Sequence, residues 1–398
     1  MQIDSAVVLA AGEGRRLRPL TRFRPKPMLP AGTRPILERV FDALIDAGVD
    51  DLHVVVGYRR DRVRNHFGPT YRDRTITYHT QKTQLGSGHA LFQAADAVDD
   101  DFLVVNGDEV ATTNAVERVI ETHSRESVAT LAVVEGEDSR EYAGVELDGG
   151  RRVTTLDETP EPGAYGLFNA GVYAFGPSVF SEIEATPQTN GERALSDTLV
   201  RLVERTGSVC GVRVDSPRAK ATYPWDLLEL AAVSLEGPTT DETGAGRETA
   251  VADSASVHED ATLRPPVAVA DDAVVEAGAV VGPDVALGAN TTVTAGSTLV
   301  GCVIDQDTRV GENTTLLDTV TGTGVEIAAG VTVPGGPGDV RIDMTVYEDR
   351  PLGAVVADRA TVGGGATLAP GVLVGPEATV SPAATVRTNL AASTEVRQ

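Results

Sequence analysis

Aliphatic residues recur at every sixth position in the second half of this chain. The first run passes through nine positions without a miss: Val251, Val257, Leu263, Val269, Val275, Val281, Leu287, Val293 and Leu299. An α-helix repeats about every 3.6 residues and a strand every two, so neither predicts this spacing. A period of six predicts a parallel β-helix, in which one aliphatic residue of each short strand points into a stacked interior.

The period continues toward the end of the chain with shifts in register. Later positions that keep it are Ile304, Val310 and Leu316, after a slip of one residue, and a new phase from Val356 to Val386. The stretch from Pro334 to Leu352 lacks an aliphatic residue at the expected step. We therefore expect a hexapeptide-repeat domain over residues 250–390, interrupted around 334–352 by a segment that loops out, and a tail over 391–398.

The first part of the chain follows a different pattern. Apolar runs precede helical periods in three clear pairs: residues 6–10 with 36–47, 52–56 with 61–66, and 102–105 with 114–123. This alternation predicts an α/β domain with a mostly parallel sheet and helices on both faces. Residues 236–249 are polar and have no apolar period, so we expect a domain over residues 1–235 followed by a linker over 236–249.

Charge excludes several classes of partner. The chain has 34 Lys+Arg and 58 Asp+Glu, a net charge of −24, and only three of its basic residues are lysines. Such a surface repels phosphate backbones and anionic membranes, so we expect no nucleic-acid or membrane partner. It also indicates adaptation to a salty cytoplasm, and no apolar run is long enough to span a membrane. Cys210 and Cys302 match no metal or redox spacing and are expected to be reduced thiols.

The strongest local signal is LAAGEGRRLRPLTRFRPKPMLP, residues 9–30, directly after the first apolar run. Gly12 and Gly14 permit a tight turn whose N–H groups face one point, which favours an anion. Basic residues follow in an otherwise acidic protein, among them Arg15, Arg16, Arg18 and Lys26. The third glycine of a dinucleotide fingerprint and the Gly-Lys-Ser/Thr of a Walker loop are missing, so both motifs are excluded. The segment therefore predicts a phosphate site of another kind.

This signature segment resembles that of the sugar-1-phosphate nucleotidylyltransferases, or NDP-sugar pyrophosphorylases, and the resemblance covers about the first 235 residues. With the hexapeptide domain, the chain resembles N-acetylglucosamine-1-phosphate uridylyltransferases and glucose-1-phosphate thymidylyltransferases. The resemblance implies a Rossmann-like nucleotidyltransferase domain followed by a left-handed parallel β-helix that forms a homo-oligomer, such as a trimer. It also implies transfer of a nucleotidyl group from UTP or dTTP to glucose-1-phosphate or N-acetylglucosamine-1-phosphate, with release of pyrophosphate.

The resemblance assigns roles to individual residues. Arg16, Lys26 and Asp108 would be catalytic, with Arg16 and Lys26 holding the triphosphate, and Asp108 and Asp226 would together hold Mg²⁺. The residues expected to bind the nucleotide are Leu9, Ala10, Ala11, Gly12, Gly14, Gln81, Gln84, Gly86 and Ser87. The residues expected to bind the sugar are Gly144, Glu158 and Asn169.

Some of these roles also follow from the residues themselves. Asp108 comes just after the apolar run 102–105, where a carboxylate emerges at the carboxyl edge of a parallel sheet. A Gln side chain offers a donor and an acceptor together, which suits the imide edge of uracil or thymine. Thr159 stands where many relatives carry lysine, and Lys220 is a candidate substitute. Neither the base nor the sugar is decided by the sequence.

Two alternatives stay open. Bifunctional relatives use a histidine of the β-helix for acetyl transfer, but the comparable stretch, Gly311 to Gly336, contains none. We therefore expect the β-helix to be chiefly an oligomerisation element, although other residues could build an acyl-transfer site. The second alternative is a catalytically silent regulatory subunit that binds a sugar nucleotide. Retention of Arg16, Lys26, Asp108 and Asp226 favours an active enzyme.

Overall fold

The computed structural model describes residues 3–124, 127–136, 142–215, 220–235 and 249–396. The chain forms two compact units. The first unit consists of Met1–Glu13, Pro25–Met28 and Ile36–Arg218, and the second of Gly14–Arg24, Leu29–Pro35 and Ala219–Gln398. None of the described helices is long and apolar enough to cross a membrane.

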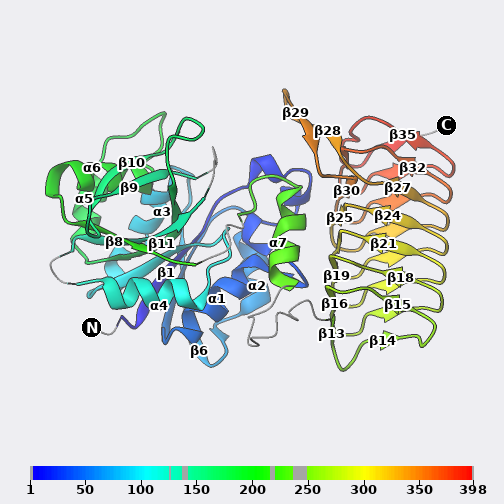
Figure 1. The fold of residues 1–398 in the computed structure, drawn as a ribbon, viewed down its shortest axis with the longest axis horizontal. Coiled ribbons are helices and arrows are strands. Elements are labelled where there is room, and N and C mark those ends of the chain that lie inside the picture. The colour runs from blue at the N-terminus through cyan, green and yellow to red at the C-terminus, as the bar shows by residue number, and fades with distance from the viewer. Residues whose placement is uncertain (1–2, 125–126, 137–141, 216–219, 236–248, 397–398) are drawn as a thin grey trace. The chain divides into compact units, whose positions relative to one another are not determined.

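The first unit is built on one ten-stranded sheet (Figure 1). Its main strand order is β10-β9-β11-β7-β1-β4-β6-β5, and β8 pairs with β11 and β12 beside this path. The strands are β1 Ser5–Ala10, β4 Asp51–Val56, β5 Thr70–Tyr71, β6 Arg74–Thr80, β7 Phe102–Asn106, β8 Ala129–Glu135, β9 Gly144–Leu147, β10 Val153–Asp157, β11 Leu167–Phe175 and β12 Val209–Arg213. Strands β7, β1, β4 and β6 are parallel, whereas β11 runs antiparallel to β7, β8 and β9. The predicted Rossmann-like fold is confirmed, with a mixed sheet because β9, β10 and β11 follow one another without a helical crossover.

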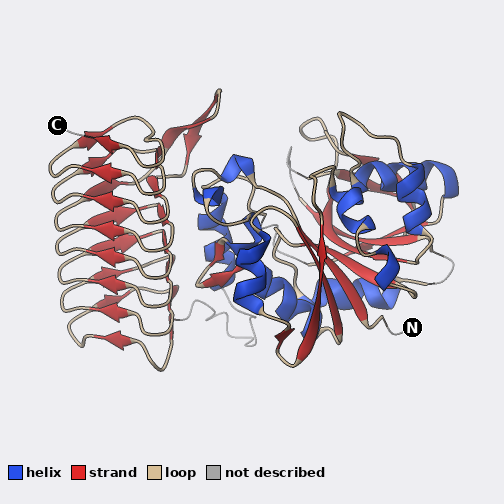
Figure 2. Ribbon diagram, turned by 180° about the vertical axis from the view of Figure 1, so that it is seen from behind, coloured by secondary structure: helices blue, strands red, loops and turns tan. Residues whose placement is uncertain are grey.

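Helices of the first unit pack in two groups. Helix α1 contacts α4, while α3, α5 and α6 contact one another, and Figure 2 shows helices on both sides of the sheet. The helices are α1 Ile36–Asp46, α2 Arg60–Phe67, α3 Ser87–Phe92, α4 Thr113–Thr122, α5 Val179–Ala185 and α6 Leu195–Thr206, with 3₁₀ turns η3 Lys26–Met28 and η4 Ala95–Ala97. Helix α4 begins after Thr112, whose hydroxyl accepts a hydrogen bond from the N–H of Ala115 (3.2 Å) as an N-cap.

A parallel β-helix forms most of the second unit (Figure 1). In its first coils, residues 18 apart pair in register, such as Val267 with Val285, and the spacing becomes 17 after the predicted slip, as in Val293 with Val310. The predicted interior positions from Val269 to Leu299 are at most 2% exposed. Val251 is 42% exposed, because it belongs to the first coil. The predicted hexapeptide fold is therefore confirmed.

Each full coil contributes one strand to each of three parallel sheets. The first sheet holds β13 Thr249–Val251, β16 Val267–Val269, β19 Val285–Leu287, β22 Cys302–Ile304, β25 Thr319–Thr321, β30 Ala354–Val356 and β33 Val372–Val374. The second holds β14 Ser256–Val257, β17 Val274–Val275, β20 Thr292–Val293, β23 Arg309–Val310, β26 Glu326–Ile327, β31 Thr361–Val362, β34 Thr379–Val380 and β36 Glu395–Val396. The third holds β15 Thr262–Leu263, β18 Val280–Val281, β21 Thr298–Val300, β24 Thr315–Leu317, β27 Thr332–Pro334, β32 Thr367–Leu368 and β35 Thr385–Val386.

One hairpin interrupts the coils. Strands β28 Gly338–Ile342 and β29 Thr345–Arg350 pair antiparallel within the stretch predicted to loop out, and Figure 1 shows them leaving the stack. The predicted linker lies outside the described residues, except for Thr249, with which β13 begins. In the predicted tail, β36 pairs with β34 and extends the second sheet.

The rest of the second unit consists of residues 14–24 and 29–35, which include part of the signature segment, and of one helix. Residues 14–24 contain η1 Arg15–Leu17 and η2 Leu20–Arg22, and residues 29–35 contain the short paired strands β2 Pro30–Ala31 and β3 Arg34–Pro35. Helix α7, Asp226–Leu235, packs against β2 and against β19, β22 and β25 of the β-helix. Both cysteines are free, and burial raises the pKa of Cys302 to about 12.

Candidate active site

The carboxyl ends of the parallel strands β4, β1 and β7 form the edge where the sequence predicts nucleotide binding. Three predicted nucleotide-binding residues lie at the end of β1: Leu9, Ala10 and Ala11. The carbonyl oxygen of Ala11 accepts hydrogen bonds from the N–H of Tyr58 and from Nε2 of Gln84, both at 3.2 Å. The carbonyl oxygen of Leu9 accepts one from the N–H of Gly107 (3.0 Å). The loops that follow β4, β6 and β7 are thereby tied to the end of β1.

The two glycines of the signature segment differ in backbone conformation and in the space around them. Gly14 is the N-cap of η1 and has φ 65°, so it occupies the left-handed region that favours glycine. A Cβ at Gly12 would meet no atom within 4 Å, which leaves open space beside the backbone there. Arg16 lies on η1 and is exposed. Gly12 belongs to the first unit, and Gly14 and Arg16 belong to the second.

Lys26 and Asp108 form an ion pair within the first unit. Lys26 begins η3, and Asp108 lies two residues after the end of β7. The distance from Lys26 Nζ to Asp108 Oδ2 is 2.5 Å, and their side chains are 12% and 28% exposed. The structure thus brings together a predicted phosphate-binding cation and a predicted metal ligand.

The loop predicted to read the base is held by backbone contacts. Gly86 has φ 94°, and a Cβ there would come within 2.4 Å of the carbonyl oxygen of Arg193. Ser87 Oγ accepts a hydrogen bond from the N–H of Leu195 (2.9 Å). Gln81 is buried, and its Nε2 donates to the carbonyl oxygen of Gly86 (3.0 Å). Gln81 therefore organises this loop from within, whereas Gln84 bonds to the end of β1.

The three predicted sugar-binding residues lie on neighbouring strands of the first unit. Gly144 pairs with Asp157 in the β9–β10 ladder, and Glu158 is the next residue. Asn169 follows Phe168, which pairs with Gly144. Although Glu158 is exposed, partial desolvation raises the pKa of its carboxyl group, and Asp197 raises it further.

Two side chains that sequence reasoning missed complete this region. A Cβ at Gly144 would come within 2.4 Å of the Tyr165 ring, so only glycine admits that ring. Asn169 Nδ2 donates to the hydroxyl of Tyr173 (2.8 Å), and its Oδ1 accepts from the N–H of Gly171 (3.1 Å). The register of β11 shifts between Asn169 and Tyr173. Bulges of this kind re-aim side chains beside active sites, and Gly171 in the GVYAF sequence is the signal that could have revealed it.

Asp226 begins helix α7 in the second unit and is 8% exposed. Its Oδ2 accepts hydrogen bonds from the N–H groups of Thr222 (2.8 Å) and Tyr223 (2.7 Å). Two backbone donors on one oxygen orient this carboxylate. The Arg16 guanidinium lies over the ring of Tyr223, 5.9 Å from its centroid. The second unit therefore groups two of the predicted site residues around Tyr223.

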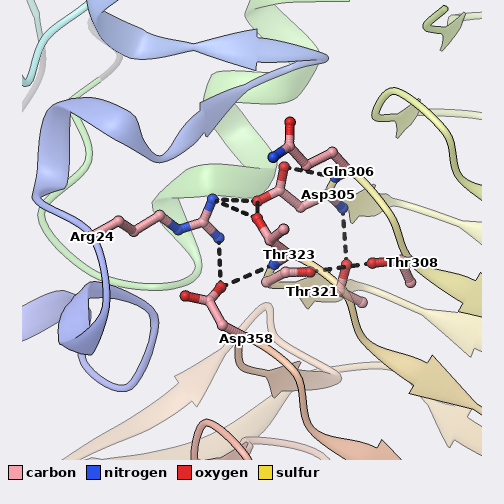
Figure 3. Close-up of polar contacts among 8 residues, drawn as sticks. Arg24, Asp305, Gln306, Thr308, Thr321, Thr323 and Asp358 are labelled. Carbon is pink, nitrogen blue, oxygen red and sulfur yellow. Dashed lines mark hydrogen bonds and ion pairs between the residues drawn. The ribbon is translucent and has the colours of Figure 1, made fainter. Parts of the chain in front are cut away.

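A buried ion-pair network anchors the signature segment to the β-helix within the second unit (Figure 3). The Arg24 guanidinium pairs with Asp305 and, at 3.1 Å, with Asp358. Thr323 joins the network, because its hydroxyl donates to Asp305 (3.2 Å) and its N–H donates to Asp358 (2.9 Å). Burial alone would lower the pKa of Arg24, but the two carboxylates raise it above its ordinary value.

Each unit holds one of the two predicted metal ligands, Asp108 in the first and Asp226 in the second. Asp108 and Asp226 are hard oxygen ligands, and Asp226 is oriented by two backbone N–H groups. Among the residues that the structure describes, no group of three or more His, Cys, Asp or Glu side chains could hold a metal ion. A divalent cation held by either carboxylate would therefore need further oxygens, from substrate or water, to complete its coordination.

A separate hollow lies at the opposite end of β7. Its volume is about 360 Å³, and Asp99, Asp100 and Asp101 line it together with residues around Ser127 and Pro177. Three carboxylates repel a phosphate, so this hollow does not suit a nucleotide.

Comparisons with known proteins show which family the first unit resembles. The model of the nucleotidyl transferase family matches residues 5–215, and that of the GMPPB C-terminal domain matches residues 263–347. UTP–glucose-1-phosphate uridylyltransferase AglF of Haloferax volcanii is 34% identical over 241 residues, which are 60% of this chain and 99% of AglF. Bifunctional protein GlmU of Methanocaldococcus jannaschii is 32% identical over 259 residues, 65% of this chain and 61% of GlmU. The chain thus spans about three fifths of that GlmU.

Solved structures show the same fold. A UDP-glucose pyrophosphorylase from Acinetobacter baumannii superimposes with a TM-score of 0.53 at 21% identity, covering 60% of this chain and 95% of that one. A UDP-glucose pyrophosphorylase in complex with UDP-glucose gives a TM-score of 0.53 at 20% identity, covering 58% and 98%. At these identities the likeness concerns the fold.

Proposed function

Because this chain belongs to the nucleotidyl transferase family, we propose that it transfers a nucleotidyl group from UTP or dTTP to a sugar-1-phosphate and releases pyrophosphate. The observation that carries this proposal is the Lys26–Asp108 pair at the carboxyl edge of the sheet, inside the matched residues 5–215. Ligands of open α/β sheets bind at this edge. The printed activity of AglF favours UTP and glucose-1-phosphate as the first substrates to test, before dTTP and N-acetylglucosamine-1-phosphate.

The reaction needs positioning and charge neutralisation more than covalent chemistry. An oxygen of the sugar phosphate attacks the α-phosphorus in line, while the bond between the α-phosphorus and the bridging oxygen of pyrophosphate breaks. No covalent enzyme intermediate forms, and no general base is required because the sugar phosphate is already ionised near neutral pH. Lys26 and Arg16 would stabilise the negative charge that grows on the α-phosphate.

The Lys26–Asp108 pair has a role before the substrate arrives. The Asp108 carboxylate neutralises the partly buried Lys26 ammonium at 2.5 Å. We propose that nucleotide binding exchanges this partner, so that Lys26 binds phosphate oxygens. The pair therefore orients the lysine in a region where an unpaired cation would be costly.

A divalent metal is general in this family, and we propose Mg²⁺ here, held by Asp108 and Asp226. When bound, Mg²⁺ would neutralise phosphate charge. The nucleotide would lie along Leu9–Gly12 and Gly14 with its base at Gln81, Gln84, Gly86 and Ser87. The sugar would be held by Gly144, Glu158 and Asn169, which neighbouring strands of the first unit bring together.

Pyrophosphate release tests the proposal. The full chain, in molar KCl with Mg²⁺, would be assayed with UTP and dTTP crossed against glucose-1-phosphate and N-acetylglucosamine-1-phosphate. We expect release that requires both substrates, and the fastest pair identifies base and sugar. Folded protein that binds nucleotide but releases no pyrophosphate with any pair would favour the silent regulatory subunit instead.

We further propose a cytoplasmic, salt-adapted homo-oligomer that assembles through the β-helix. A net charge of −24 supports adaptation to salt, because screening relieves self-repulsion. We expect the melting temperature to fall as KCl is lowered from molar concentration to dilute buffer. Circular dichroism melts measure this, and the same Tm at both salt concentrations would contradict it. Light scattering would test for a trimer.

A further inference from the structure

The hairpin that interrupts the β-helix presents one aromatic side chain inward. In β29, Thr345–Arg350, five of the six residues are exposed and Tyr347 alone is half-buried. Its cross-strand partner on β28 is Val340, which is fully buried. Val346, the preceding residue, is 42% exposed. Because successive residues of a strand point to opposite faces, Tyr347 lies on the covered face of the hairpin and Val346 on the open one.

Tyr347 packs into an aromatic cluster, defined here as Tyr223, Trp225 and Tyr347. The Tyr223 and Trp225 rings are stacked, with centroids 4.6 Å apart and planes at 12°. The Tyr347 ring lies 4.8 Å from Tyr223 and 5.4 Å from Trp225, and its hydroxyl donates to the Tyr223 hydroxyl at 3.2 Å. Arg350, also on the hairpin, places its guanidinium over Trp225 at 5.5 Å. The hairpin therefore contacts the rings of both Tyr223 and Trp225.

Two members of the aromatic cluster, Tyr223 and Trp225, come just before Asp226, the first residue of α7. The N–H of Tyr223 is one of the two backbone donors to Asp226 Oδ2. The ring of Tyr223 makes a second contact, because the guanidinium of Arg16 lies over it. Tyr223 thus contacts two residues of the proposed site through different groups, its N–H and its ring. A shift of Tyr223 would move both contacts at once.

We propose that Tyr347 is a positioning residue for nucleotidyl transfer, which acts through Tyr223 on Asp226 and Arg16. The inference rests on the proposed function. All of these residues belong to the second unit, so the hairpin extends the role of the β-helix from assembly to support of the reaction. Placement errors of about 1 Å in such groups can cost up to about a hundredfold in rate. A partial loosening by loss of one ring should cost less.

Three single variants test the proposal. Tyr347→Ala removes the ring and the hydroxyl, Tyr347→Phe keeps the ring, and Val346→Ala is the matched control on the opposite face of the same strand. Trp225 is the only tryptophan in the chain, so its fluorescence reports on the aromatic cluster without any substrate. We expect Tyr347→Ala to shift the Trp225 emission to longer wavelength and to increase its quenching by acrylamide. Tyr347→Phe and Val346→Ala should leave both close to wild type.

Kinetics then separate a positioning role from a merely structural one. In Tyr347→Ala we expect the KM for the nucleotide and the Mg²⁺ concentration for half-maximal rate to rise about five- to tenfold. The interaction free energy of an aromatic pair corresponds to a change of about this size in a binding constant. The KM for the sugar phosphate, whose proposed ligands lie in the first unit, should change less than twofold. Tyr347→Phe should recover most of the loss.

Each outcome has a distinct meaning. If Tyr347→Ala alters the Trp225 emission but keeps wild-type constants for nucleotide and Mg²⁺, the positioning role is wrong. If all three constants change equally, the effect is a general loss of structure and the proposal also fails. If Tyr347→Ala does not fold, Arg350→Gln, which withdraws the cation from Trp225, is measured by the same criteria. An inactive wild-type chain would instead overturn the proposed function.

Discussion

The sheet of the first unit and the β-helix of the second place their special residues by different rules. In the sheet, Lys26, Asp108 and Gln84 are held at the carboxyl edge by short contacts between neighbouring loops. In the β-helix, the regular coils bury aliphatic residues and carry none of the predicted site residues. Some residues of the β-helix domain contact segments outside its coils. They lie in the corners of the coils, as Asp305 and Asp358 do, or in the interrupting hairpin, as Tyr347 does.

This difference shows where function can be added to each architecture. An open sheet offers a ligand edge because its parallel strands all end on the same side. A β-helix has no such edge, since every coil is covered by the next one, so its contribution comes through its corners and through interruptions of the period. The Arg24 network is an example of the first and the aromatic cluster of the second, and both contact segments that carry predicted site residues.

Removal of Arg24 should have the largest effect. In Arg24→Met, the carboxylates of Asp305 and Asp358, 12% and 8% exposed, would stay buried without their cation. We expect the free energy of unfolding to fall by about 3 kcal/mol. Denaturation followed by Trp225 fluorescence measures it, with the exposed Arg309→Gln as control. Adding Asp305→Asn and Asp358→Asn should recover part of the loss. An unchanged midpoint in Arg24→Met would show that the network does not hold the signature segment.

The edge of the sheet should govern turnover rather than stability. We expect Lys26→Ala and Asp108→Asn each to lower kcat on the order of 10² or more, because each removes a preorganised charge. Pyrophosphate release measures this, and circular dichroism checks that the fold is kept. The exposed Asp99→Asn, in the same unit, should retain full activity. Near wild-type turnover in either site variant would refute the assignment.

Much of the fold could be predicted from the sequence, because its two patterns are local. The period of six predicted the coils and their interior residues, and alternating apolar runs predicted β1, β4 and β7 with the helices that follow them. The mixed character of the sheet was missed, because the sequence of β11 does not indicate which strands it pairs with or in which direction. The Arg24 network joins residues 281 and 334 positions apart, a separation at which a pattern gives no signal.

The candidate site divides in the same way. Glycines and charges within the signature segment are close in sequence, so their chemistry could be predicted. Tyr347 lies 124 residues from Tyr223, in the stretch where the period fails, and nothing in its neighbourhood indicates a partner. Tyr165, whose ring packs against Gly144, was missed because no sequence pattern links the two residues.

Gly86→Ala tests whether the base-reading loop depends on its contact with Arg193. A Cβ at Gly86 would approach the Arg193 carbonyl oxygen to 2.4 Å at a backbone φ of 94°. We expect a loss of about 2 kcal/mol in stability and a higher KM for the nucleotide. Gly68→Ala is the control, because φ is 65° there and a Cβ meets nothing within 4 Å. Equal losses in both variants would attribute the effect to φ alone.

Acid should loosen the first unit before the second. Burial lowers the pKa of His53 and of His123, both in the first unit, below the ordinary value. Their neutral forms therefore favour folding, and the stability present above about pH 6.5 is lost as pH falls through the lowered pKa values.

Denaturation between pH 7 and 5 measures this difference. Circular dichroism should report loss of the helices of the first unit while the Trp225 emission in the second unit stays constant. His53→Gln with His123→Gln should flatten the pH dependence. Simultaneous loss of both signals would contradict the expected order.

The fate of the α-phosphorus tests the central claim most directly. The full chain would receive Mg²⁺, glucose-1-phosphate and UTP labelled at either the α- or the γ-phosphorus, in molar KCl. Nucleotidyl transfer predicts that the α label appears in the UDP-sugar and the γ label in pyrophosphate. Appearance of the γ label in inorganic phosphate or in a sugar bisphosphate, with the α label left in UDP, would contradict it.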